Sequence, residues 1–216
     1  MQKYKNYTCS IYLFLQKKAL SKLTADFYLH DDVVLIAKEL LGKIIFTKFD
    51  GTLCGGIITE TEAYAGIHDK ASHAYSGRRT ARTEIMYCKG GTAYVYLCYG
   101  VHSLFNVVTN KKNVPDAVLI RGFSPLTGIE TMLRRTAKKN ADKNFCVGPG
   151  KVSKALGIHF SHTGTDLCGN KIWLEDTGIN VLKNEINTGT RIGVDYADED
   201  ALLPYRFIFT KYQKKI

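Results

Sequence analysis

The chain has 216 residues, of which 45% are hydrophobic, and this is enough to form one domain with its own core. Lysine and arginine number 30 against 20 aspartate and glutamate, so the formal charge is +10, which fits association with a polyanion such as nucleic acid but also a basic surface without a ligand. No stretch approaches the roughly 20 apolar residues that a membrane-spanning helix needs, which excludes that class of membrane protein.

The chain begins with MQKYKNYTCSIYLFLQKKAL, in which lysines precede a short apolar run. A signal peptide starts in a similar way, but QKK follows the run directly and no cleavage site of the A-x-A type is present. The six cysteines include no C-x-x-C pair, so we expect reduced thiols. These features favour a cytoplasmic protein, associated with the nucleoid if the source is bacterial, with an irregular N-terminal extension.

The next segments predict a helix followed by a hairpin. HDDVVLIAKELLGK spaces its apolar residues on one helical face, with Asp31 or Asp32 at the N-cap and Gly42 just past the end. In KIIFTKFDGTLCGGIITETEA, the pair Asp50-Gly51 lies between two β-rich runs and indicates a tight turn.

The remaining elements are mostly strands. A second hairpin is expected with strands at 93–98 and 103–108, and AVLIRGF indicates a buried strand. PLTGIETMLRRTAKKN predicts a helix that opens with a capping box, Thr127 and Glu130, and closes with Arg134, Arg135, Lys138 and Lys139. KIWLE and YRFIF resemble strands. No alternation of strands and helices supports a parallel sheet, so the pattern predicts an α+β fold.

Two glutamates stand in the second strand of the first hairpin. Residues two apart share a strand face, so Ile58, Glu60, Glu62 and Tyr64 line up if the strand stays regular. A solvated face is the simplest explanation for such a pair. However, glutamate is a poor strand former, and a carboxylate among apolar and aromatic neighbours gains a raised pKa and can act as a general base.

Tyrosines gather beside basic residues further along the chain. Tyr94 and Tyr96 share a strand face, while Tyr99 falls at the tip of the second hairpin. There it either wedges between nucleic-acid bases or folds back onto the surface. The neighbouring arginines are candidate phosphate contacts: Arg78, Arg79 and Arg82.

Two further motifs are less specific. His68, Asp69 and His73 lie close in sequence, but their spacing matches no metalloenzyme helix, and we expect no metal there. CVGPGKVSKALGI places glycines before a helix, so backbone N–H groups near Gly150 and the Lys151 side chain either receive a phosphate or simply begin the helix.

Taken together, the chain resembles the alkyladenine (3-methyladenine) DNA glycosylases of the mammalian alkylpurine type. The resemblance is carried, in order, by ITETEAYAGIHDKASHAYSGRRTARTEIMY, GTAYVYLCYGVHSLFNVV, VLIRGFSP, GPGKVSKALGI and RIGVDYADEDALLPYRFIF. It covers residues 23–216 and leaves 1–22 as an extension without a counterpart. One departure is TNKKNVPDA, which differs from the family in length, so Arg121 is matched through VLIRGFSP alone.

The resemblance implies a role for particular residues. Glu62 corresponds to the general base that activates water, and Glu60 to a neighbour. Tyr99 corresponds to a tyrosine that intercalates into DNA, and Asn106 to an asparagine on the pocket floor that disfavours guanine. The other expected pocket residues are Tyr64, His73, Tyr96 and Arg121.

It also implies a single α+β domain, with a largely antiparallel curved sheet, surrounding helices and a protruding β-hairpin. The expected protein is a monomer that needs no cofactor. Its partner is duplex DNA containing alkylated purines such as 3-methyladenine, which it flips out and releases by hydrolysis, leaving an abasic site for base excision repair. No lysine stands out as a Schiff-base nucleophile, so no strand cleavage is expected.

Two other classes of function remain open from the residues alone. A glycoside hydrolase could use Glu60 and Glu62 as its carboxylate pair, although a charge of +10 is not needed for neutral sugars. A nucleic-acid-binding module could use the tyrosine-rich hairpin without any chemistry, although Glu62 then weakens its hold on an anion.

Overall fold

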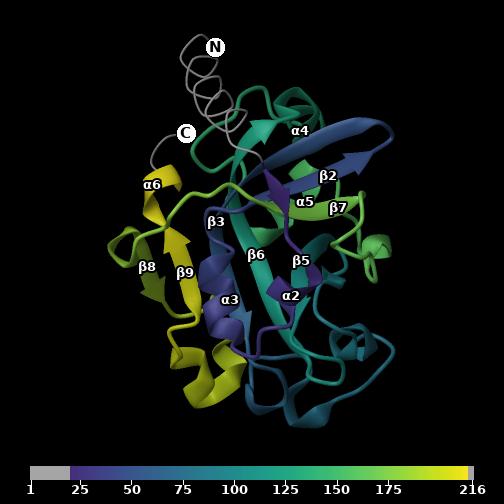
Figure 1. Ribbon diagram of the computed structural model, residues 1–216, viewed down its shortest axis with the longest axis vertical. Helices are drawn as coiled ribbons and strands as arrows, with labels where there is room; N and C mark the ends of the chain where they lie inside the picture. The colour runs from purple at the N-terminus through teal and green to yellow at the C-terminus, as the bar shows by residue number, and fades with distance from the viewer. Residues whose placement is uncertain (1–19, 214–216) are drawn as a thin grey trace.

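The computed structural model describes residues 20–213, so most of the expected N-terminal extension lies outside it (Figure 1). The strands are β1 Ser21–Lys22, β2 Ile44–Phe49, β3 Thr52–Tyr64, β4 Ala93–Cys98, β5 His102–Thr109, β6 Asp116–Thr127, β7 Ile172–Asp176, β8 Ile186–Gly189 and β9 Arg206–Phe209. The α-helices are α2 Ala25–Tyr28, α3 Val33–Glu39, α4 Ile129–Thr136, α5 Pro149–Leu156 and α6 Thr210–Gln213. Short 3-10 helices are η1 Gly66–His68, η2 Tyr75–Gly77, η3 Glu84–Tyr87, η4 Phe160–His162, η5 Lys183–Glu185 and η6 Asp195–Leu202.

The described strands form one antiparallel sheet in the order β1-β7-β2-β3-β6-β5-β4. Strand β3 is the longest, and it runs beside β6 through the middle of the molecule (Figure 1). Along its other edge it pairs first with β2 and then with β9, which also pairs with β8. The prediction of a single α+β domain with a large antiparallel sheet is confirmed. The sheet includes β1, whose two residues fall in the segment assigned to the extension.

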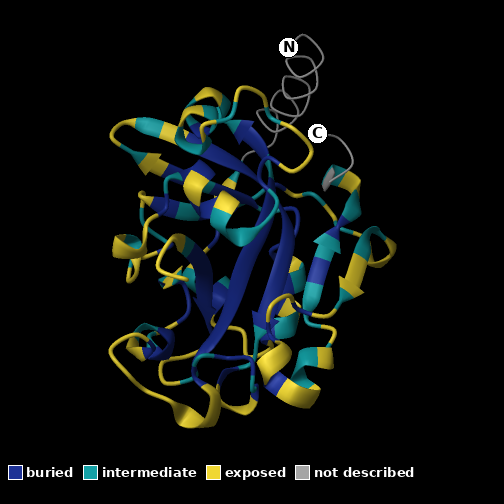
Figure 2. Ribbon diagram, turned by 180° about the vertical axis from the view of Figure 1, so that it is seen from behind, coloured by how far each residue is buried: buried dark blue, intermediate teal, exposed yellow. Residues whose placement is uncertain are grey.

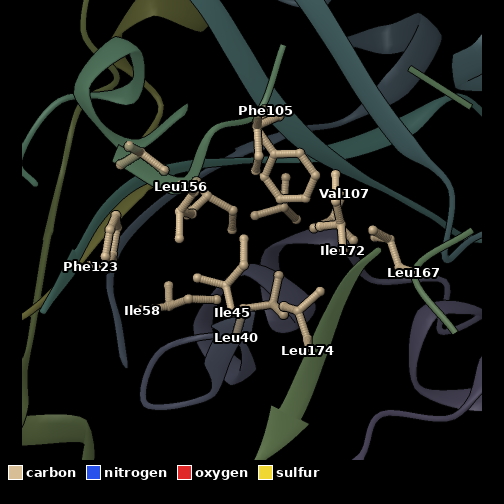
Figure 3. Close-up of a cluster of buried hydrophobic side chains, with 14 of the residues drawn as sticks. Leu40, Ile45, Ile58, Phe105, Val107, Phe123, Leu156, Leu167, Ile172 and Leu174 are labelled. Atoms are coloured by element: carbon tan, nitrogen blue, oxygen red, sulfur yellow. The ribbon is translucent and has the colours of Figure 1, made fainter. Parts of the chain in front are cut away.

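Helices α3 and α5 cover one side of this sheet and share its main core. Their side chains join buried residues of β2, β3, β5 and β6 in one apolar cluster, part of which is shown in Figure 3. In Figure 2 the central strands are buried along most of their length, whereas exposed residues gather in the loops. Burial of this apolar surface supplies the main driving force for folding. The opposite face of β3 does not face this core, and it carries the polar side chains of Glu60 and Glu62.

Local signals in the sequence place several elements correctly. Asp32 is the N-cap of α3, and its carboxylate accepts from the Leu35 N–H at 2.9 Å. Asp50 and Gly51 both have positive φ, as a tight hairpin turn requires. The second hairpin pairs β4 with β5, and the pairing already begins at His102, one residue before the expected strand.

The expected capping box of α4 is wrong. The helix begins at Ile129 with Gly128 as its N-cap, and no side chain caps it. Strand β6 extends to Thr127, so the Thr127 backbone belongs to the sheet and not to the helix. The helix also ends at Thr136, before Lys138 and Lys139. Tertiary strand pairing has overridden the local capping signal.

The prediction that Ile58, Glu60, Glu62 and Tyr64 share one face of β3 is wrong for Ile58. The β3–β6 pairing has irregularities between Ile58 and Glu60 and between Glu60 and Thr61. As a result, Ile58 packs in the main core, and Thr61 also faces α3, where its hydroxyl donates to the Ala37 carbonyl at 2.7 Å. Glu60 and Glu62 keep a common side, because both contact Arg121. The bulge lets one strand serve both the core and a polar site.

Close approach of β3 and β6 gives a first test of this fold. A Cβ at Gly56 would lie 2.3 Å from the Ser124 carbonyl oxygen. We therefore expect Gly56→Ala to lower the free energy of unfolding by about 2–3 kcal/mol, measured by chemical denaturation. Gly51→Asn is the control, because its turn has open space and asparagine tolerates positive φ. Equal stability of Gly56→Ala and wild type would contradict the described packing.

Candidate active site

A cavity of about 350 Å³ opens where β3, β4, β5 and β6 meet the segment before η6. Aromatic rings dominate its walls, and few charged groups reach it. Segments far apart in sequence contribute to it, so the fold itself assembles the cavity. The lining residues are Tyr64, Ala71, His73, Met86, Tyr94, Tyr96, Cys98, Tyr99, Leu104, Asn106, Ala117, Arg121, Pro149, Ile192, Gly193, Val194 and Tyr196.

Glu62 lies directly behind this wall and has no exposed surface. Its Oε2 accepts from the Tyr64 hydroxyl at 2.9 Å and from Arg121 Nη1 at 3.3 Å, and its Oε1 accepts from the Ile192 N–H at 2.9 Å. All three donors belong to residues that line the cavity. Burial raises the pKa of Glu62, while Arg121 and the two hydrogen bonds oppose that rise. The result is a buried carboxylate of increased basicity.

Arg121 reaches Glu62 because it occupies the irregular part of the β3–β6 pairing. Its neighbours Ile120 and Gly122 pair with Thr61 and Glu60, and Arg121 itself is the extra residue between them. Its Nε donates to Glu60 Oε1 at 3.1 Å. A single guanidinium therefore bridges both glutamates of the strand.

Tyr64 is held from two sides. Burial and the neighbouring Glu62 raise the pKa of its hydroxyl, so the hydroxyl stays protonated and donates to the carboxylate. The Arg191 guanidinium lies 4.9 Å from the centre of its ring. Arg191 is itself fixed by a buried ion pair with Asp69 and by donation to the Ala63 carbonyl at 3.0 Å. Through its ion pair with Arg191, Asp69 therefore helps to hold the segment 191–196 against β3.

His73 meets the cavity next to Tyr94 and Tyr96. Its Nδ1 lies 2.7 Å from the Tyr94 hydroxyl, and its Nε2 lies 3.4 Å from Arg82 Nη2. Because arginine can only donate, we assign Nε2 as the acceptor and Nδ1–H as the donor to Tyr94. Burial, with Arg82 and Arg78 nearby, lowers the pKa of His73 to about 4. The ring is therefore neutral at physiological pH and offers an uncharged edge.

Asn106 is buried at the junction of β4 and β5. Its Nδ2 donates to the backbone oxygens of Tyr94 at 3.1 Å and Leu104 at 3.3 Å. Both donated hydrogens are thus engaged with backbone, so Oδ1 is the polar atom that the amide can offer as an acceptor. The amide is held in one orientation at the cavity wall.

The tip of the second hairpin projects at the edge of the cavity. Tyr99 is 93% exposed, which excludes the alternative that it folds back onto the surface. On the other side of the tip lies a groove of about 480 Å³ that begins at α5. Gly150 and Lys151, in the first turn of α5, line this groove with Lys138 and Lys154. The exposed Tyr99 ring therefore stands between the aromatic cavity and a groove flanked by lysines.

The arginines predicted as phosphate contacts differ in how free they are. Arg78 and Arg82 are exposed, and the Arg82 guanidinium lies 4.8 Å from the centre of the Tyr96 ring. Arg79 is also exposed but donates twice to Glu84, at 2.7 Å each, and lies over Tyr87. The charge of Arg79 is already compensated, so it is the weakest of the three candidates.

Three contributors to the site escaped the sequence analysis. Tyr196 lines the cavity, and its hydroxyl donates to the Ala71 carbonyl at 3.1 Å. Ile192 supplies a backbone donor, and Arg191 supports Tyr64. All three lie in the RIGVDY segment, which the family resemblance includes, but only the fold shows that it reaches Glu62. No local pattern marks a backbone N–H as part of a site.

Neither a metal site nor a membrane helix is found in the described chain. Within residues 20–213, no group of three or more His, Cys, Asp or Glu side chains lies close enough to hold a metal ion. Over the same range no helix has the length and apolar character to cross a bilayer. The five cysteines between residues 20 and 213 form no disulfide with one another, and two of them, Cys54 and Cys146, are buried.

Comparison with known proteins identifies the family. The sequence profile of the methylpurine-DNA glycosylases matches residues 26–213. A Chlamydia felis protein is 45% identical over 196 residues, covering 90% of this chain and all of the relative. Proteins of Clostridium perfringens (43% identical; 86% and 94% covered) and Desulfitobacterium hafniense (41%; 87% and 95%) are similar too. All three are described as candidate 3-methyladenine DNA glycosylases.

The chain is therefore an enzyme of the DNA glycosylase class. More specifically, the chain is a member of the methylpurine-DNA glycosylase family, and the resemblance seen in its sequence is confirmed.

The Asp69–Arg191 pair generates a prediction about stability. Removing one charge of a buried pair leaves the other uncompensated, so we expect Asp69→Asn to lower the free energy of unfolding by about 3–5 kcal/mol. Glu199→Gln, which breaks an exposed contact to Lys70, is the matched control and should change little. Denaturant unfolding of both variants checks this. A loss in Asp69→Asn no larger than that in Glu199→Gln would contradict it.

Proposed function

We propose that this protein releases alkylated purines, 3-methyladenine among them, from duplex DNA by hydrolysing the N-glycosidic bond. The observation that carries the proposal is a fully buried carboxylate, Glu62, behind an aromatic cavity whose edge bears the exposed Tyr99. The names of the relatives and the family support the same substrate class. The product would be an abasic site, the starting point of base excision repair.

The cavity suits a base that has left the helix. Its volume of about 350 Å³ lies within the roughly 300–1,000 Å³ of small-molecule sites. Stacking of a base on an aromatic ring contributes about 1–3 kcal/mol, and Tyr64 and Tyr96 supply such rings. A cationic alkylated purine gains further from the electron-rich ring faces, and the neutral His73 does not repel it.

Glu62 would act as the general base. A carboxylate has about four lone-pair positions, and three donors occupy three of them, which leaves one acceptor position for a water proton. Its raised pKa makes the carboxylate a stronger base than an exposed glutamate. Its negative charge would also stabilise the oxocarbenium-like transition state of glycosidic cleavage.

Tyr99 would fill the space that the extruded nucleotide leaves. Base flipping costs a few kcal/mol, least for a damaged or mispaired base, and an inserted side chain keeps the gap closed. The lysine-flanked groove next to Tyr99, with the free N–H groups at the start of α5, would hold the adjacent phosphates. Arg78 and Arg82 would add contacts beside the cavity.

Asn106 would contribute to the choice of base. Its Nδ2 donates to two backbone oxygens, so the side chain is fixed in one orientation at the cavity wall. The exocyclic amine of guanine, which adenine lacks at that position, would then meet a rigid wall. We propose that this restricts entry of undamaged guanine.

The two alternative classes fit the site less well. For a glycoside hydrolase, Glu60 would have to be a free acid, but its Oε1 accepts from both Arg121 and Arg206. For a binding module without chemistry, a buried anion behind the base cavity weakens affinity and has no purpose. Neither class gains support from a separate observation.

The central test compares wild type with Glu62→Gln. We expect release of free base from a duplex containing one defined lesion to fall by at least about 100-fold, because the general base is lost while the shape is kept. Chromatography of the released base under single-turnover conditions measures this. Glu185→Gln, a glutamate paired with Lys211 away from the cavity, is the control. Equal release by Glu62→Gln and wild type would refute the assigned role.

The product should be an intact strand with an abasic site. Strand cleavage by a glycosylase needs an amine nucleophile, and the cavity lining contains no lysine. We expect labelled DNA to break only after alkali treatment. Breaks that form with the enzyme before alkali would show a lyase step and overturn hydrolysis as the sole reaction.

A further inference from the structure

Glu60, the second buried glutamate of β3, is linked to Glu62 through Arg121. The Glu60 side chain is 5% exposed, and its Oε1 accepts from Arg121 Nε at 3.1 Å and from Arg206 Nη1 at 3.4 Å. Arg121 in turn reaches Glu62 Oε2 at 3.3 Å. The groups form a row of alternating charge from β9 to the cavity: Arg206, Glu60, Arg121 and Glu62.

Because one guanidinium contacts both glutamates, its hydrogen bond to Glu60 affects how Arg121 is oriented toward Glu62. A guanidinium is planar, and its donors are fixed relative to one another. When Nε is bound to Glu60, the plane is oriented and Nη1 points to Glu62 Oε2. Without Glu60, Arg121 would be free to turn its fork onto Glu62 as a bidentate pair. That pairing would occupy the acceptor position left for water.

We propose that Glu60 is a positioning residue for base release: with Arg206, it orients Arg121 and limits how much of the arginine's charge acts on Glu62. The proposal rests on the function proposed for Glu62.

The orientation of Arg121 affects the pKa of Glu62, because charged groups of both signs act on that carboxylate. Arg121 favours the ionised carboxylate, whereas Glu60 disfavours it. An uncompensated arginine would lower the pKa of Glu62 and weaken it as a base, whereas loss of the arginine would raise that pKa and favour the protonated form. The ionisable groups that surround Glu62 are Glu60 and Tyr64 on β3, Arg121 on β6, Arg206 on β9, and Arg191 before η6.

Two substitutions should therefore move the pH dependence in opposite directions. Glu60→Gln removes a negative charge but keeps an oxygen that accepts from Arg121. The ionised form of Glu62 is then favoured, its pKa falls, and the acid limb of base release moves to lower pH. Arg206→Gln removes a positive charge, so the limb moves to higher pH. We expect each shift to be about half to one pH unit.

The experiment measures single-turnover release of 3-methyladenine from methylated duplex DNA between about pH 5 and pH 9. The positive charge of this lesion does not titrate in that range, and release without enzyme is subtracted. Wild type, Glu60→Gln, Arg206→Gln and the control Glu185→Gln are compared, with thermal unfolding to establish that each is folded. Glu60→Gln should also lower the plateau rate several-fold, and Glu185→Gln should leave the limb in place.

The outcomes separate this proposal from the function on which it rests. The proposal is supported if the acid limb of base release moves to lower pH in Glu60→Gln and to higher pH in Arg206→Gln. A purely structural role of these residues would instead lower release equally at every pH. If wild type releases base but the limbs coincide or move the same way, the proposal is overturned and the function stands. If Glu60→Gln does not fold, an unmoved limb in Arg206→Gln overturns it. If wild type releases no base, the function itself fails.

Discussion

The site depends on how Glu62, a carboxylate with no exposed surface, is kept ionisable. Burial favours the protonated form of Glu62, and the protein opposes this with donors from β3 itself, from β6 and from the segment before η6. Each donor has its own support. The bulge aims Arg121, and the Asp69–Arg191 ion pair holds the segment that carries the Ile192 N–H. The elements that satisfy Glu62 also form the cavity walls.

The surroundings of the cavity fit the same account. The antiparallel sheet packs its main core against α3 and α5, while Glu60 and Glu62 lie on the opposite side of β3, where both contact Arg121. The second hairpin carries Tyr99 beyond the surface, beside the lysine-flanked groove. The excess of basic residues in the chain thus has a partner of opposite charge in the DNA backbone. The lysines of that groove lie apart from Glu62, which is buried behind the cavity wall.

Local patterns predicted much of the fold. Asp32 caps a helix, Asp50-Gly51 makes a turn, and the tip position of Tyr99 follows from the length of the strands around it. These features depend on neighbours in sequence. The failures have non-local causes: Thr127 is drawn into β6 by its pairing with β3, and Ile58 turns to the core because Thr59 is an extra residue of β3 between the pairs Ile58–Phe123 and Glu60–Gly122. A period of two cannot reveal where strand pairing introduces a bulge.

The candidate site was predictable mainly through resemblance to a family. Strand period made Glu60 and Glu62 equivalent, and only their partners separate them: Glu60 meets two arginines, while Glu62 meets residues of the cavity. The roles of Arg191, Ile192 and Tyr196 required the fold, since they lie more than a hundred residues from the groups they contact.

The pH dependence of base release by the wild-type enzyme tests the account most directly. In the proposed mechanism Glu62 acts in its ionised form, and its pKa is raised, so single-turnover release should decline as the pH falls, with a midpoint above the ordinary value of 4.5. This acid limb should be absent from whatever slow release Glu62→Gln retains. A wild-type rate that does not change with pH down to about 4, or a limb that persists in Glu62→Gln, would contradict a buried glutamate as the base.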